Sequence, residues 1–89
     1  MDIKKEQEEQ IINIGVFGYK APKIASILSF DVKKVEKELE DKDSKLNLLL
    51  SKGKDLADYV IDLKLFEMAK TGDIKALDKL NYRKNMRNR

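Results

Sequence analysis

Hydrophobic positions recur along this chain at steps of three and four residues, and no long stretch alternates between apolar and polar side chains. Steps of three and four place side chains on one face of an α-helix, whereas a half-buried strand requires alternation. The pattern therefore predicts an all-α fold with five helices. We expect them to cover residues 3–17, 22–29, 32–41 and 45–70, and a stretch that begins near residue 74.

The predicted helix ends have recognisable capping residues. Pro22 suits the first position of a helix, where a missing N–H costs nothing. Asp31 is a good N-cap for the third helix, and Asp43 or Ser44 for the fourth. In the segment 71–73, Thr-Gly-Asp, the glycine suits the residue after a helix end and the aspartate a new N-cap. These signals predict a helical hairpin at the C-terminal end of the sequence.

The fourth helix is long for so small a protein. Residues 45–70 would extend about 39 Å at a rise of 1.5 Å per residue, and residues 1–43 cannot cover such a rod along its whole length. Gly53 is its weak point, since glycine inside a helix costs about 1 kcal/mol relative to alanine. The glycine marks either a kink or a close approach of another helix. The surplus apolar face predicts an oligomer interface formed by Leu49, Leu56, Val60 and Leu63.

Composition excludes most kinds of catalytic site. The chain has no histidine and no cysteine, so an imidazole base, a thiol nucleophile and an ordinary zinc site are all excluded. The segment 15–18, Gly-Val-Phe-Gly, lacks the Lys-Ser/Thr pair that follows in a phosphate-binding P-loop. We therefore expect no enzyme activity, no catalytic residues, no bound metal and no cofactor.

Charge is nearly balanced overall, with a formal net charge of +3, but it is unevenly distributed. Residues 1–43 carry eight basic and ten acidic side chains, and residues 44–89 carry eleven and six. The segment 81–89 is expected to be a basic tail that contacts DNA phosphates or an acidic partner, and to be poorly ordered after Tyr82. Its candidate contacts are Arg83, Lys84, Arg87 and Arg89.

Apolar runs are short throughout the chain. None approaches the roughly 20 residues that span a bilayer, and the first residues lack the apolar centre of a signal peptide. We expect a soluble protein of the cytoplasm with no membrane partner.

Residues 23–35 have the spacing of a helix-turn-helix. Ala25 is small enough for two helices to cross closely, Leu28 points into the core, a tight turn follows at residues 29–30, and Val35 packs from the next helix. The second of these helices would be the recognition helix in the DNA major groove. The candidate phosphate contacts of this head, residues 1–43, are Lys20, Lys23, Lys33, Lys34 and Lys37.

A three-helix bundle with no DNA role is the alternative. It is favoured by the acidic residues of the same helix, because carboxylates are repelled by phosphates. These are Glu36, Glu38, Glu40 and Asp41.

The layout resembles the small terminase subunits of tailed bacteriophages. The resemblance covers residues 9–84 and is carried by Ile24-Ala25-Ser26-Ile27-Leu28, by Lys52-Gly53-Lys54 and by Ala69-Lys70-Thr71-Gly72-Asp73-Ile74-Lys75-Ala76-Leu77. It implies a helix-turn-helix head (1–43), a hairpin for oligomerisation (44–80) and a basic tail (81–89). The implied partners are double-stranded DNA, further copies of this chain in a ring, and a large ATPase-nuclease subunit. The implied location is the host cytoplasm.

The chain departs from that family's pattern in two places. The head is acidic on balance, and Asn81-Tyr82 stands where an aromatic-leucine pair is common. A small dimeric helix-turn-helix transcription regulator is therefore the alternative function. An adaptor that binds an acidic protein through the basic tail is a third.

Overall fold

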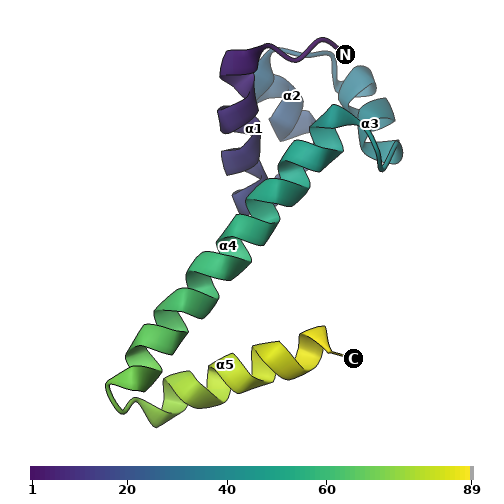
Figure 1. Cartoon of the computed structure of the whole chain (residues 1–89). Coiled ribbons are helices and arrows are strands. Elements are labelled where there is room, and N and C mark those ends of the chain that lie inside the picture. The colour runs from purple at the N-terminus through teal and green to yellow at the C-terminus, as the bar shows by residue number, and fades with distance from the viewer. Residues whose placement is uncertain (89) are drawn as a thin grey trace. The chain divides into compact units, whose positions relative to one another are not determined.

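The computed structural model describes residues 1–88, and within them it contains five helices and no strand. The helices are α1 (Lys5–Phe17), α2 (Ala21–Leu28), α3 (Val32–Glu40), α4 (Lys45–Lys70) and α5 (Ile74–Arg87), as Figure 1 shows. The all-α prediction is confirmed. The chain divides into two compact units, Met1–Leu56 and Ala57–Arg89, each of which is described by itself.

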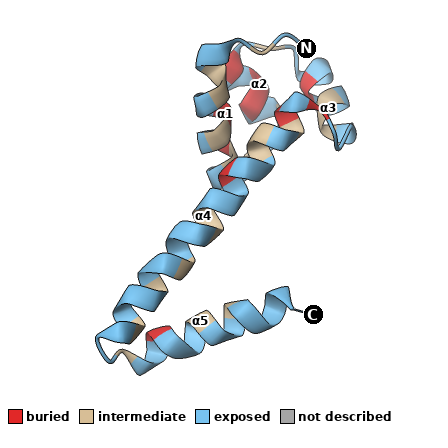
Figure 2. Ribbon diagram, in the orientation of Figure 1, coloured by how far each residue is buried: buried red, intermediate tan, exposed pale blue. Residues whose placement is uncertain are grey.

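Four helical segments build the core of the N-terminal unit. Its largest fully buried side chains are Ile11 of α1, Ile24 of α2, Val35 of α3 and Leu46 of α4. Figure 2 shows buried positions gathered where these segments meet. Because Leu46 belongs to this core, the compact unit extends beyond residue 43, the predicted end of the head.

Two glycines let α1 and α4 touch backbone to backbone. A Cβ added at Gly53 would overlap the carbonyl oxygen of Ile12, and a Cβ added at Gly15 would overlap the carbonyl oxygen of Leu50. Gly53 is buried, and α4 continues through it without interruption. Of the two roles predicted for Gly53, the structure therefore supports a close helix approach.

The connection between α2 and α3 is a tight turn. Ser29 ends α2 with φ at 60°, in the left-handed region that few residues other than glycine adopt. The Phe30 N–H then donates to the Ala25 carbonyl at 3.0 Å. Asp31 caps α3 as predicted, because its Oδ1 accepts from the Lys33 N–H at 2.9 Å. Helices α2 and α3 pack directly against each other.

The C-terminal end of α3 is tied to the start of α4. The Ser44 hydroxyl donates to the Glu38 carbonyl at 2.8 Å. The Asn47 side-chain amide lies within hydrogen-bond distance of the Glu38, Leu39 and Asp41 carbonyls, at 3.2, 2.9 and 2.7 Å. These two side chains satisfy carbonyls that the end of a helix otherwise leaves without partners. These hydrogen bonds hold the C-terminal end of α3 against the N-terminal end of α4.

The C-terminal unit is a helical hairpin formed by the second half of α4 and by α5. Gly72 takes φ at 97° in the turn, and Asp73 Oδ1 accepts from the Ala76 N–H at 3.1 Å, as the capping pattern predicted. Ala76 is buried. Helix α5 continues to Arg87, so residues 83–87, predicted to be poorly ordered, are helical instead.

Candidate nucleic-acid interface

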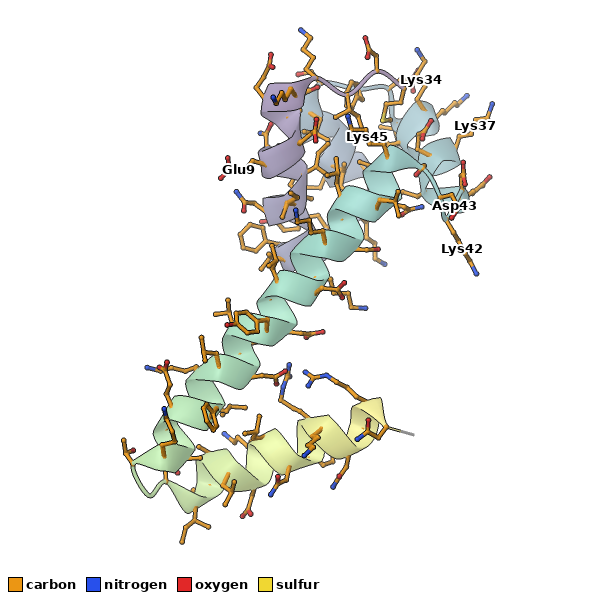
Figure 3. All side chains as sticks on the ribbon, viewed as in Figure 1. Glu9, Lys34, Lys37, Lys42, Asp43 and Lys45 are labelled. Carbon is orange, nitrogen blue, oxygen red and sulfur yellow. The ribbon has the colours of Figure 1, made fainter. Side chains whose placement is uncertain are left out.

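The outer side of α3 carries three of the predicted phosphate contacts. Val35 is fully buried beneath α3, and helical geometry then places Lys33, Lys34 and Lys37 on the side away from the core. All three lysines are exposed. Figure 3 shows Lys34 and Lys37 pointing outward from the helix. The fold therefore brings these three cations onto one exposed helical surface.

This surface also carries acidic side chains. Glu36, Glu40 and Asp41 are exposed on α3 or directly after it. The lysines lie in the first two turns of α3, and two of these three acids lie at its C-terminal end. The surface of α3 is therefore most positive, and most favourable for DNA phosphates, near its N-terminal end.

Two further predicted contacts lie at the start of α2. Lys20 is the N-cap residue of α2, and both Lys20 and Lys23 are exposed. The Lys23 Nζ lies 3.9 Å from the centre of the Tyr19 ring, a cation–π contact that leaves the ammonium group at the surface.

The basic residues of α5 have partners that the sequence analysis did not identify. The Arg83 Nε donates to Asp62 Oδ1 at 2.7 Å, and its Nη2 donates to Asp58 Oδ1 at 3.3 Å. Arg87 pairs with the other oxygen of Asp62. These contacts join α5 to α4 within the hairpin and explain why residues 81–87 are helical. They also occupy two of the four cations of the predicted basic tail, Arg83 and Arg87.

A signal for this network was present in the sequence. Asp58 and Asp62 are four residues apart, as are Arg83 and Arg87, so each pair occupies one helical face. Two acidic positions facing two basic positions across a hairpin turn favour ion pairing. The other two predicted tail contacts are Lys84, which is exposed on α5, and Arg89, which lies outside the described residues.

The Arg83 network should make the hairpin sensitive to acid. The hydrogen bond from Arg83 holds the pKa of Asp62 below the usual 3.8. Partial burial of Asp62 raises this pKa, and Arg87 lowers it further. A lowered pKa in the folded state stabilises the fold at pH values above the unfolded pKa. That contribution is lost as the pH falls through the folded value. We expect the free energy of unfolding of the hairpin, measured by urea unfolding followed by circular dichroism, to fall by a small amount below about pH 4.

An asparagine at position 62 provides the comparison. Asp62→Asn removes the titrating carboxylate. The variant should be less stable than the wild type at neutral pH, and its stability should fall less than that of the wild type between pH 5 and pH 2. Asp55→Asn is the matched control, because Asp55 is exposed and forms no ion pair within residues 1–88. Equal acid sensitivity of the wild type and the Asp62 variant would contradict this role of Asp62.

An exposed apolar stripe runs along the second half of α4. Tyr59 and Val60 are each 61% exposed, and Leu63 and Phe66 follow at helical spacing with 38% and 48% exposure. We call these four residues the α4 stripe. Leu56, earlier on the same helix, is exposed too. Three of the four predicted interface residues therefore have free apolar surface.

Leu49, the fourth, is placed differently. It is partly buried and packs against the core of the N-terminal unit. Most of its side chain is thus engaged within one chain.

The described residues contain no group of three or more acidic side chains placed to hold a metal ion. Among residues 1–88, no helix combines the length and the apolar character that a bilayer crossing requires. No protein-family model matches the chain, and neither a curated protein nor a solved structure matches it.

Proposed function

We propose that this protein is a non-enzymatic DNA-binding component that self-associates, of the kind represented by small terminase subunits in viral DNA packaging. In this proposal the N-terminal unit binds double-stranded DNA and the hairpin joins copies into a ring. A separate large ATPase-nuclease subunit would act on the DNA that the ring holds. The phosphate contacts on the head are Lys20, Lys23, Lys33, Lys34 and Lys37.

The observation that carries the DNA-binding part is the geometry from α2 to α3. Ser29 adopts the left-handed conformation at the position where helix-turn-helix turns commonly have glycine. The following helix buries Val35 and exposes Lys33 and Lys34 at its N-terminal end. A recognition helix enters the major groove with its N-terminal residues toward the DNA. Since α3 has no Arg, Asn or Gln, phosphate contacts dominate this binding.

A second candidate, a dimeric helix-turn-helix regulator, is favoured by the spacing of the α4 stripe. Tyr59, Leu63 and Phe66 are separated by four and then three residues, and Leu56 precedes Tyr59 by three. This spacing is typical of a two-stranded coiled coil. A dimer in solution favours the regulator, and eight or more chains favour the packaging ring. Light scattering distinguishes them.

The DNA-binding part is tested by changing Lys33 and Lys34 together to alanine. We expect weaker binding to all duplex sequences alike, because the contacts are to phosphates. The slope of log affinity against log salt should become less steep by about one unit per lysine. Fluorescence anisotropy over a salt series measures both quantities.

The matched control removes the same charge elsewhere. Lys64→Ala with Lys75→Ala also eliminates two exposed lysines, both on the hairpin. This double variant should retain most of the affinity. If the Lys33 and Lys34 variant binds duplex DNA as the wild type does, α3 is not the DNA-binding helix.

A further inference from the structure

The turn between α1 and α2 leaves an aromatic ring largely exposed to solvent. Phe17, the last residue of α1, is 62% exposed. Its ring centre lies 5.4 Å from that of Tyr19, and the two ring planes are inclined at 30°. Tyr19 in turn contacts Lys23. Gly18, with φ at 70°, reverses the chain between the two aromatic residues.

Positive charge surrounds this aromatic pair. From residue 13 to residue 30 the sequence has two basic side chains, Lys20 and Lys23, and no acidic one. Beside Tyr19 lies a shallow hollow of about 200 Å³, whose lining includes Gly15, Ser51 and Lys54. Lys54 thus adds a third cation from α4. We call Phe17, Tyr19, Lys20, Lys23 and Lys54 the aromatic corner.

We infer that the aromatic corner binds single-stranded nucleic acid, with an unpaired base stacked on Phe17 and backbone phosphates held by the three lysines. Exposed aromatic rings within a positive surface are the recurring means of binding single strands, because every base has a face that can stack. A duplex keeps its bases stacked on one another and offers no such face. This site goes beyond the proposed duplex binding. It shares Lys20 and Lys23 with the proposed duplex contacts but uses none of the α3 lysines.

The chemistry of the corner disfavours a second copy of the chain as its occupant. A symmetric contact at Phe17 would bring the same three lysines of each copy together, and like charges oppose that approach. Phe17 and the adjacent exposed Val16 also offer little apolar area compared with the roughly 800 Å² per partner of a standard interface. A polyanion with flat apolar groups fits both features.

The test compares two conservative changes at Phe17. Phe17→Leu keeps an apolar side chain but removes the aromatic face, whereas Phe17→Tyr keeps the face. Binding is followed by fluorescence anisotropy with a labelled oligothymidine of about 12 nucleotides and with a blunt duplex. We expect Phe17→Leu to weaken single-strand binding about 5- to 150-fold, the range for one stacked base. Phe17→Tyr should bind like the wild type, and neither change should alter duplex affinity.

Two comparisons keep this site separate from the proposed duplex site. Leu48→Ala alters another exposed apolar residue of the same unit and should leave single-strand binding unchanged. The Lys33 and Lys34 double variant should bind duplex more weakly while retaining oligothymidine binding. Equal single-strand affinity of Phe17→Leu and the wild type would overturn the inference. So would a change in solution mass caused by Phe17→Leu, because the corner would then be a protein contact.

Discussion

Gly53→Ala should destabilise the N-terminal unit by at least about 2 kcal/mol. Propensity alone predicts the opposite sign, since alanine is favoured over glycine inside a helix by about 1 kcal/mol. Steric overlap decides the result. The added methyl group would meet the backbone carbonyl of Ile12, which cannot rotate away as the end of a side chain can, and would lie 3.2 Å from the Cα of Gly15. The α1–α4 crossing would have to open, and the apolar contacts around it would loosen.

Urea unfolding followed by circular dichroism measures this change. Ser51→Ala is the matched control, because Ser51 is exposed on the same helix and gains helix propensity without a steric conflict. Its midpoint should stay equal or rise slightly. If Gly53→Ala instead raised the stability by the amount that propensity predicts, α1 would not lie against α4 at this position.

Val60→Asp should lower the molecular mass of the protein in solution. The motive is the α4 stripe, whose four large apolar side chains remain between 38% and 61% exposed. Association through this stripe would enclose Val60, and an unpaired carboxylate in an apolar interface is strongly unfavourable. We expect association to weaken by about 3 kcal/mol, which is more than 100-fold in Kd.

Multi-angle light scattering over a concentration series gives the mass. Met68→Asp is the control, since Met68 is exposed on the same helix but lies outside the stripe. That variant carries the same new charge and should assemble as the wild type does. A wild-type protein that is monomeric at high micromolar concentration would refute association through the stripe and with it the ring.

Local rules predicted much of the fold. The bounds of α4 agree with the predicted residues 45–70, and the caps at Asp31 and Asp73 form as expected. Each of these features depends on residues within a few positions of one another. A cap needs only its own first turn, and the apolar spacing of one helix is visible in a single window.

Contacts between distant residues were beyond these rules. The sequence pattern does not identify α1 as the helix that packs against Gly53. A small residue within a helix indicates a close contact but not which element makes it. Residues 83–89 have Met86 as their one apolar anchor, so their own pattern predicts a poorly ordered tail. Asp58 and Asp62 supply the missing anchors. The candidate DNA contacts on α3 remain a prediction, for which the structure establishes position and exposure.

The way α5 is held has a kinetic consequence. Its one buried side chain is the small Ala76, and its other ties to α4 include the Arg83 and Arg87 ion pairs near the surface. Partly exposed ion pairs contribute little free energy, whereas the N-terminal core buries four large side chains completely. Helix α5 should therefore detach and redock many times within one lifetime of the folded core. Its amide protons would exchange with solvent through these brief openings, and those of α1 mainly through global unfolding.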